Sequence, residues 1–410
     1  MTAGRPWDVG IIGCGTAGAA AALFLAREGH RITVYERVPD PGAVGAGVLI
    51  QPTGQRVLQE LGLLEPVLAR GARVTGLRCV TPRNRPIVEI AYRNLGPDQF
   101  GLGVHRGVLF ETLFRATRGE PGITVRCGIE IEDLAAQGAR NFVVEKESRQ
   151  RHGPHDLIVV ADGARSQLRD DTALHKRVTP YPWGAVWCIL EDPQRAFPDT
   201  LYQVADGTRR LVGFLPTGRG PGAADGPPLV SLFWSVQCDR VDRECRGDRF
   251  LPWKEEILRY IPQAETVLAQ LTSPDQVLFS RYLDVRMATW NTANVVYLGD
   301  AAHATSPQLG QGCNLALLDA ATLGRSIAAH PELPAALDAY SRARRRHLAY
   351  YQFATRALTL LFQSDHAFLG PLRDLGMGLG GRLPWINRQM TLTMAGVSLG
   401  PFARLDNPAK

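Results

Sequence analysis

Three glycines near the start of the chain have the spacing that dinucleotide-binding loops require. Gly13, Gly15 and Gly18 form the pattern G-x-G-x-x-G between an apolar segment at 8–12 and an alanine-rich segment at 19–28. In such a loop the first glycine permits a tight turn, the second lets the backbone approach a pyrophosphate, and the third lets helix and strand pack closely. Because the first N–H groups of a helix have no partner within it, they bind the anion. The pattern therefore predicts a nucleotide-binding site.

An acid after the next strand supports the same interpretation. The strand predicted at 31–35 is followed by Glu36, close to the roughly 20-residue spacing at which an acid binds ribose hydroxyls. An acid at this position argues against a 2′-phosphate, but it does not distinguish FAD from NAD. The remaining members of this predicted cofactor site are Thr16, Ala17 and Arg37.

Two later strands also end in an acid beside a glycine. The apolar segment 157–161 runs into Asp162-Gly163, and the apolar segment 294–298 runs into Gly299-Asp300. A glycine-rich turn at 307–314 follows the second acid and leads into a helical pattern. An acid followed by a turn with few side chains indicates that a ligand lies across the turn.

The motifs GCGTAG, ADGARSQLR and LGDAAHATSPQLGQGCN occur in an order and spacing that resemble the class A flavoprotein monooxygenases. These are the para-hydroxybenzoate hydroxylase family of FAD-dependent aromatic hydroxylases, and the resemblance covers essentially the whole chain. It implies non-covalent FAD, NAD(P)H as a transient reductant, and O₂. It also implies that a C4a-hydroperoxyflavin hydroxylates or epoxidises an aromatic or conjugated small molecule. In such enzymes the flavin carries the difficult chemistry, and the protein excludes water and orients the reactants.

The resemblance also assigns roles to individual residues. Asp300 would hydrogen-bond the ribityl chain, Arg106 would lie near the pyrophosphate and ribityl chain, and Asp162 would contact the cofactor and the NAD(P)H region. The turn would lie along the isoalloxazine edge, where helix N–H groups stabilise negative charge on the reduced ring. Its predicted cofactor-binding residues are Pro307, Gly310, Gly312, Cys313 and Asn314. We interpret Cys313 as packing beside the ring, and a thioether bond to the flavin is the alternative. No catalytic acid or base is assigned.

The elements that position these motifs indicate an α/β fold. The strand–helix–strand unit at the start of the chain builds a parallel sheet. Four aromatic-rich runs between residues 181 and 236, separated by turns, predict a mostly antiparallel sheet. The fold class is a Rossmann-like FAD-binding domain with an inserted sheet domain and C-terminal helices, which are expected to break at Gly370-Pro371 and at 376–381. The predicted boundaries are 1–75, 100–176 and 281–335 for the FAD-binding domain, 76–99 and 177–280 for the substrate-binding sheet, and 336–410 for the helical region.

The inserted sheet is the predicted substrate-binding element. Its strands lie between FAD-binding segments in the chain, so they can fold over the flavin. The aromatic residues predicted to contact substrate are Trp183, Trp187, Tyr202, Phe214 and Phe233. Because strand side chains alternate, Trp183 and Trp187 share one face, and we expect that face to point at the flavin. The helices after residue 357 carry few charges and are expected to cover this cavity or to contact a membrane or a partner.

Composition limits the remaining possibilities. The net charge is +6, nearly all of it from arginine, but no basic tract with interleaved aromatic residues indicates nucleic-acid binding. The seven cysteines are scattered without a C-x-x-C pair, so neither a disulfide framework nor a metal site is expected. No leader or membrane-spanning segment is recognisable, which predicts a cytoplasmic location. A monomer or a homodimer is expected. The arginine run predicted to be solvent-exposed is Arg342, Arg344, Arg345 and Arg346.

Three other functions remain open from the sequence. A flavin-dependent halogenase is disfavoured, because the chain lacks the Trp-x-Trp-x-Ile-Pro motif and the lysine of those enzymes. A flavin-dependent reductase of double bonds would be distinguished by its lack of stoichiometric oxygen use. A non-catalytic FAD-binding accessory protein would be distinguished by the absence of NAD(P)H turnover.

Overall fold

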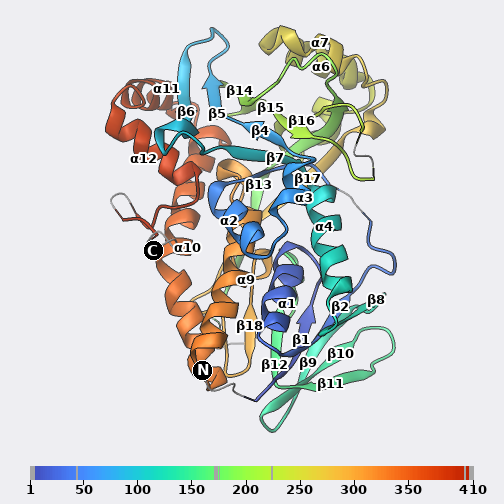
Figure 1. The fold of residues 1–410 in the computed structure, drawn as a ribbon. Coiled ribbons are helices and arrows are strands. Elements are labelled where there is room, and N and C mark those ends of the chain that lie inside the picture. Colours follow the sequence, from blue (N-terminus) through green and yellow to red (C-terminus); the bar gives the residue numbers. More distant parts are fainter. Residues whose placement is uncertain are drawn as a thin grey trace.

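The computed structural model describes residues 5–42, 45–169, 174, 176–222, 225–400 and 403–405. It has a lower part built on a parallel sheet and an upper part built on a larger, mostly antiparallel sheet, with the long helix α10 alongside (Figure 1). This arrangement is the Rossmann-like domain with an inserted sheet and C-terminal helices that the sequence predicts.

The lower sheet has five strands, all in parallel register, in the order β18-β12-β1-β2-β8. Helices cover one face of this sheet, and strands of a small three-stranded sheet pack on the other, so its central strands are almost entirely apolar. The carboxyl ends of β1, β12 and β18 carry the three motifs. The strands are β1 (Asp8–Ile12), β2 (Arg31–Glu36), β8 (Ile123–Cys127), β12 (Leu157–Val160) and β18 (Val295–Tyr297). The covering helices include α1 (Thr16–Arg27), α4 (Arg106–Gly119) and α9 (Gly312–Ala329).

Two three-stranded sheets flank this core. One lies at the base of the molecule and continues from β8 along the chain (Figure 1). The other joins the lower part to the upper sheet. The first contains β9 (Ile131–Gln137), β10 (Arg140–Glu145) and β11 (Arg151–His155). The second contains β3 (Gly47–Ile50), β7 (Gly101–His105) and β4 (Ala72–Val74), with α2 (Pro52–Glu60) and α3 (Leu64–Leu68) between β3 and β4.

The upper sheet has seven strands in the order β17-β13-β16-β15-β14-β5-β6, and only the β14–β5 pair is parallel. One face packs on short helices and the other faces the C-terminal helices. The strands are β5 (Gly76–Val80), β6 (Pro86–Ala91), β13 (Arg177–Glu191), β14 (Thr200–Asp206), β15 (Arg210–Gly218), β16 (Leu229–Gln237) and β17 (Leu278–Arg286). The short helices are α5 (Val241–Cys245), α6 (Phe250–Tyr260) and α7 (Glu265–Leu268).

The C-terminal helices are α10 (Leu333–Phe362), α11 (Leu369–Gly380) and α12 (Pro384–Met394). The break predicted at Gly370-Pro371 is wrong, because this dipeptide forms the first turn of α11, where a proline needs no N–H partner. The break predicted at 376–381 is also wrong for all but the last residue, because α11 continues to Gly380. At Gly378 the helix passes so close to β6 that a Cβ atom would lie 2.8 Å from the carbonyl oxygen of Pro86, so only glycine fits there. Within the described residues, no helix is long and apolar enough to cross a bilayer.

Candidate cofactor and substrate site

The glycine loop between β1 and α1 has two tightly packed glycines and one open one. A Cβ atom on Gly13, whose φ is +95°, would lie 2.5 Å from the carbonyl oxygen of Ala161. A Cβ atom on Gly18 would lie 2.0 Å from the carbonyl oxygen of Gly13. Gly15, by contrast, has nothing within 4 Å of that position, and no side chain caps the helix that follows it. The loop therefore offers uncapped N–H groups beside open space, which fits a pyrophosphate.

Glu36 fixes this loop from the end of β2. Its Oε2 accepts a hydrogen bond from the backbone N–H of Cys14 at 2.8 Å, and its Oε1 accepts one from Val38 at 3.0 Å. Each carboxylate oxygen retains a second acceptor site, which fits ribose hydroxyls. Arg37 is exposed next to it. Glu36 thus holds the glycine loop as well as occupying the predicted ribose position.

The loop after β12 contains a buried, unsatisfied carboxylate oxygen. Asp162 Oδ1 is buried and has no hydrogen-bond partner among the described residues. Burial raises the pKa of Asp162, while the charges of Arg169 and Arg37 oppose this rise. Buried polar atoms are nearly always partnered, so this oxygen is a candidate contact for a bound molecule. The adjacent Gly163 faces open space, since nothing lies within 4 Å of a Cβ atom there.

Arg169 ties this loop to the one after β18. Its buried guanidinium donates to the carbonyl oxygen of Ala301 at 2.8 Å, and to those of Ala164 and Ser166 at 2.7 and 2.9 Å. Two acid-bearing loops that are far apart in the chain are therefore held at one edge of the sheet. The sequence places Arg169 within the ADGARSQLR motif, but a motif does not reveal which carbonyl groups an arginine will reach.

Asp300 lies beside the start of helix α9. It is exposed as the first residue of α8 (Asp300–His303), directly after Gly299, whose φ is +58°. The nearest atom to a Cβ on Gly312 would be Asp300 Oδ1, at 3.8 Å. The single-turn helix η6 (Pro307–Leu309) and the left-handed Gly310 lead into α9, which also starts without a side-chain cap. The arrangement places an acceptor and uncapped N–H groups side by side.

Asn314 and Cys313 follow in the first turn of α9. The buried Asn314 donates to the carbonyl oxygens of Leu49 and Gly310 at 3.0 and 3.1 Å, and accepts from the N–H of Gln51 at 2.8 Å. Its side chain thus holds the turn against β3, and any cofactor contact is left to its backbone. Burial raises the pKa of Cys313 to about 12. The thiol is therefore protonated at neutral pH, which disfavours its attack on a flavin.

Arg106 approaches the same turn from the start of α4. Its side chain packs against Gly45, where a Cβ atom would lie 2.7 Å from Arg106 Cδ. Its charge lies close enough to Cys313 to oppose the rise in that residue's pKa. Within the described part of the chain the exposed guanidinium makes no ion pair or hydrogen bond. It is thus a free cation beside the predicted cofactor turn.

A buried polar network supports the Asp300 loop from behind. Asp319 Oδ2 accepts from the N–H of Gly299 at 2.9 Å and from His303 Nε2 at 2.5 Å. Its Oδ1 accepts from Arg344 Nε at 2.7 Å. Burial alone would raise the pKa of Asp319, but His303 and Arg344 lower it to about 2. The prediction that Arg344 is solvent-exposed is wrong, because this position of α10 faces α9; Arg342, Arg345 and Arg346 are exposed as predicted.

A cavity of about 520 Å³ lies between the upper sheet and the C-terminal helices. Its wall is largely apolar, and Gln308 and Leu309 of the glycine-rich turn form part of it. The cavity is therefore adjacent to the predicted flavin edge. The other lining residues are Leu77, Cys79, Val88, Ile90, Gln203 and Leu211 from the sheet, Tyr350, Ala354, Ala357, Leu358 and Phe362 from α10, and Met377, Trp385, Ile386, Gln389, Met390, Thr393 and Met394 from α11 and α12.

The five aromatic residues predicted to contact substrate do not line this cavity. Phe214 stacks on Phe197 with ring centroids 4.2 Å apart, in the core beneath α5–α7, and Tyr202 packs against the same core. Trp187 and its cross-strand partner Phe233 lie toward the C-terminal helices, and Trp183 is buried. Alternation along a strand shows which residues share a face, but not which face a later helix will cover.

The fold and the three loops define a flavoprotein with a two-part, FAD-binding architecture. Residues 6–351 match the model of the FAD binding domain family, and the chain belongs to that family. It is 29% identical to 6-methylpretetramide 4-monooxygenase of Streptomyces rimosus, over 80% of this chain and 76% of that protein. It is 27% identical to a probable 2-heptyl-3-hydroxy-4(1H)-quinolone synthase of Rhodococcus erythropolis, over 82% and 83% of the two chains.

Solved structures share the fold at lower sequence identity. A variant of Klebsiella pneumoniae HpxO complexed with FAD superposes with a TM-score of 0.77 at 20% identity, over 96% of this chain and all of that one. The protein is an FAD-dependent monooxygenase that uses NAD(P)H as reductant, as the sequence predicts.

Proposed function

We propose that this enzyme inserts one oxygen atom into an aromatic or conjugated small molecule of largely apolar character, bound in the 520 Å³ cavity. The observation that carries the proposal is the position of this apolar cavity, whose wall includes Gln308 and Leu309 of the glycine-rich turn. Two related proteins support the same substrate class, since one is named as a monooxygenase of a pretetramide and the other as a probable synthase of an alkylated quinolone.

We assign the cofactor contacts to the three loops. Gly15, Thr16 and Ala17 would bind the pyrophosphate through backbone N–H groups, and Glu36 would accept from the adenosine ribose. Arg37 would lie near the same end of FAD.

The remaining contacts concern the flavin half of the cofactor. Asp300 would accept from a ribityl hydroxyl, and Arg106 and Asp162 would lie beside it. The residues assigned to the isoalloxazine edge are Pro307, Gly310, Gly312, Cys313 and Asn314. Bound FAD supplies the redox chemistry, since once reduced by NAD(P)H it reacts with O₂ to deliver an oxygen atom.

The chain's own residues would create the environment that this chemistry needs. The uncapped start of α9 and the cation of Arg106 both favour negative charge at the flavin edge. The apolar wall of the cavity excludes water from the substrate side. We also propose that the cofactor is held without a covalent bond, because the Cys313 thiol is protonated. Acid precipitation of the purified yellow protein should then release all of its flavin, and flavin retained on the denatured chain would contradict this.

The test of function is turnover with ¹⁸O₂. Phenols, indoles, quinolones and polyketides are screened with the FAD-loaded protein for stimulated NADH or NADPH oxidation, and the products are analysed by mass. Incorporation of a single labelled oxygen atom is expected. A product that gains two hydrogens or a halogen, without label, would overturn the proposal in favour of the reductase or the halogenase.

The cellular setting is proposed on separate grounds. All seven cysteines are free, and NAD(P)H is an intracellular reductant, which supports a cytoplasmic location. O₂ and one small-molecule substrate would be the other reactants.

A further inference from the structure

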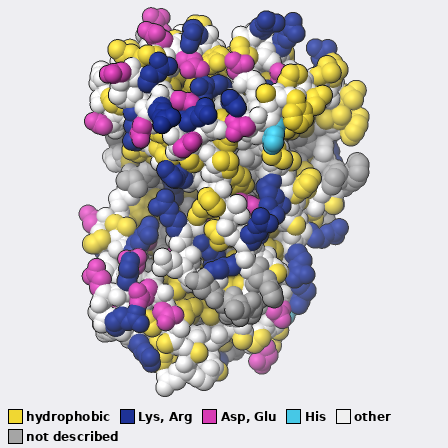
Figure 2. All heavy atoms as spheres, turned by 180° about the vertical axis from the view of Figure 1, so that it is seen from behind, with side chains coloured by type: hydrophobic (Ala, Val, Ile, Leu, Met, Phe, Trp, Pro, Cys, Tyr) yellow, Lys and Arg dark blue, Asp and Glu magenta, His cyan; other side chains and the backbone are white. Residues whose placement is uncertain are grey.

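Helix α11 presents an apolar stripe to solvent. Phe368, Leu372, Leu375 and Leu379 are 66, 61, 62 and 53% exposed, and their spacing puts them on one side of the helix. A helix on the surface of a globular protein normally turns such a stripe toward the core. Figure 2 shows hydrophobic side chains gathered at this corner of the molecule, at the upper right of the view.

The stripe continues into the start of α12. Leu383 is 48% exposed and Trp385 is 65% exposed. We call the surface formed by these residues and the α11 stripe the α11–α12 face. Eight of the twelve large hydrophobic residues that are exposed in the described chain fall between Phe353 and Trp385, and the other four are scattered over the rest of the molecule. Contiguous exposure of this kind marks an interaction surface.

The inner side of α11 is fixed, so the stripe cannot rotate inward. The buried Arg373 donates to the carbonyl oxygens of Gly207 and Leu361 at 2.8 and 3.0 Å. Gly370 packs against Gly207, where a Cβ atom would lie 3.1 Å from its Cα. These contacts make the outward orientation of the stripe a stable feature of the fold.

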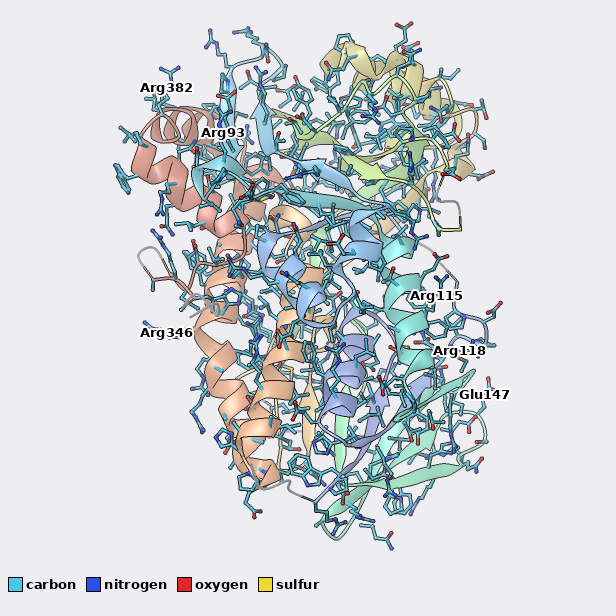
Figure 3. All side chains as sticks on the ribbon, in the orientation of Figure 1. Arg93, Arg115, Arg118, Glu147, Arg346 and Arg382 are labelled. Carbon is cyan, nitrogen blue, oxygen red and sulfur yellow. The ribbon has the colours of Figure 1, made fainter. Side chains whose placement is uncertain are left out.

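The charges around this face are positive. The two carboxylates between residues 361 and 400 are already paired, Asp365 with Arg209 at 3.0 Å and Asp374 with Arg373 at 2.6 Å. Three exposed arginines make no ion pair within the described residues: Arg93, Arg382 and Arg388. Figure 3 places Arg93 and Arg382 at the end of the molecule that carries α11 and α12, and Arg388 lies one helical turn after Trp385.

We propose that the α11–α12 face docks on an anionic phospholipid bilayer. A helix with an apolar stripe and flanking arginines lies flat in the headgroup region, where the stripe is buried and the cations meet lipid phosphates. Tryptophan is favoured at that interface, which suits Trp385. A second copy of the chain is a poorer partner, because a two-fold contact through the same face would bring its unpaired arginines toward one another.

The docked face adjoins the substrate cavity. Trp385 belongs to the exposed face and also lines the cavity, together with Met377 on the inner side of α11. If a lipophilic substrate enters between these helices, it passes from the bilayer to the site without crossing water. This delivery step rests on the proposed function, whereas the docking itself does not.

Docking is tested with the FAD-loaded protein and sedimented vesicles. Phosphatidylcholine vesicles are compared with vesicles that also contain phosphatidylglycerol. Binding to the anionic vesicles, weakened by salt, is expected, and equal failure to bind either kind would overturn the proposal. Flavin absorbance of the unbound fraction measures the partition coefficient and confirms that the protein is folded. It needs no substrate, so its outcome is separate from that of the ¹⁸O₂ experiment.

Matched variants locate the contact. Leu375→Asp should lower the partition coefficient by about tenfold or more. It removes a leucine that would be buried in the bilayer, and it adds a negative charge that the anionic lipids repel. Leu375→Gln is the milder variant if the first does not retain FAD. Leu251→Asp, at an equally exposed leucine of α6, is the control and should bind as the unaltered protein does. Equal losses at Leu251 and Leu375 would overturn the assignment to this face.

The arginines are tested in the same way. Arg382→Glu together with Arg388→Glu should abolish the preference for anionic vesicles, while Arg346→Glu on α10 should leave it intact. Sedimentation of the protein alone tests the alternative, a second copy of the chain on this face. If the protein forms a dimer that Leu375→Asp dissociates, and if it does not bind vesicles, the face is a contact between copies and the membrane proposal is wrong.

Discussion

Asp300 is the exposed acceptor at the centre of the candidate site, and its contribution can be isolated. Its side chain makes no hydrogen bond within the described chain, so its removal should disturb the cofactor more than the fold. A hydrogen bond to a charged group contributes on the order of 1.5–3 kcal/mol. The Asp300→Ala variant should therefore bind FAD at least about tenfold more weakly in fluorescence titrations. An unchanged dissociation constant in a folded variant would place the ribityl contact elsewhere.

Arg169 acts on the site through the loops it joins. Lysine retains the charge but cannot donate to three carbonyl groups in fixed directions. Arg169→Lys should therefore lower the melting temperature of the FAD-free protein and also weaken FAD binding, because buried carbonyl groups lose their partners. Arg346→Lys, at an exposed position of α10, should change neither quantity. If Arg169→Lys affected only the melting temperature, the two loops would not need this arginine to bind FAD.

A buried histidine that links α10 to the segment after α12 makes the stability of the fold depend on pH. His347 accepts from Arg344 Nη1 at 3.0 Å and donates from Nε2 to the carbonyl oxygen of Gly396 at 2.8 Å. Burial and the charge of Arg344 lower the pKa of His347 to about 3. In the unfolded chain His347 takes up a proton near pH 6.5, whereas in the folded chain it stays neutral. The free energy of unfolding therefore falls as the pH drops below 6.5. The slope from this residue approaches about 1.4 kcal/mol per pH unit.

The corresponding measurement is the urea midpoint between pH 7.5 and 5. The pKa of Asp319 is lowered to about 2, so its stabilising contribution is complete above about pH 4 and is lost only below that pH. Asp319 therefore adds no pH dependence between pH 7.5 and 5. The His347→Gln variant can donate and accept as the neutral imidazole does, yet it does not titrate. Its stability should therefore fall less steeply with decreasing pH than that of the unaltered protein. Parallel pH profiles for the two proteins would contradict a buried neutral histidine.

The sequence predicts those elements whose causes are local. The predicted bounds of the βαβ unit agree with the observed ones to within three residues. Its apolar runs, alanine-rich helix and turn glycines all lie within one short segment, so the signals that determine it are local. Arg344 could not be placed, because its burial depends on Asp319 in a neighbouring helix. The close approach of Gly378 in α11 to Pro86 likewise depends on a strand that is distant in the sequence, and it leaves no room for a side chain at this position.

At the scale of the whole molecule, the cavity proposed to bind substrate is formed by segments that meet only in the folded chain. Its wall combines strands of the inserted sheet, two residues of the cofactor turn and the three C-terminal helices. Of the aromatic residues that the sequence favours, Phe214 and Tyr202 pack behind the sheet, and Trp187 and Phe233 face the helices without lining the cavity. The cavity is lined mostly by aliphatic residues and methionines. Only the order of the segments in the chain indicated that sheet and flavin would face each other.

Filling this cavity should separate substrate binding from cofactor binding. Ala354 lines the cavity from α10, and Ala349 is exposed on the same helix. Because an added ring occupies volume that the substrate needs, Ala354→Phe should raise the substrate KM about tenfold or more, which corresponds to about 1.4 kcal/mol of lost binding free energy. FAD affinity should stay unchanged, since no cofactor loop contains this position. Ala349→Phe is the control and should retain full substrate-stimulated NAD(P)H oxidation. If Ala354→Phe behaved like this control, the substrate would bind outside the cavity, and the proposed site between sheet and helices would be wrong.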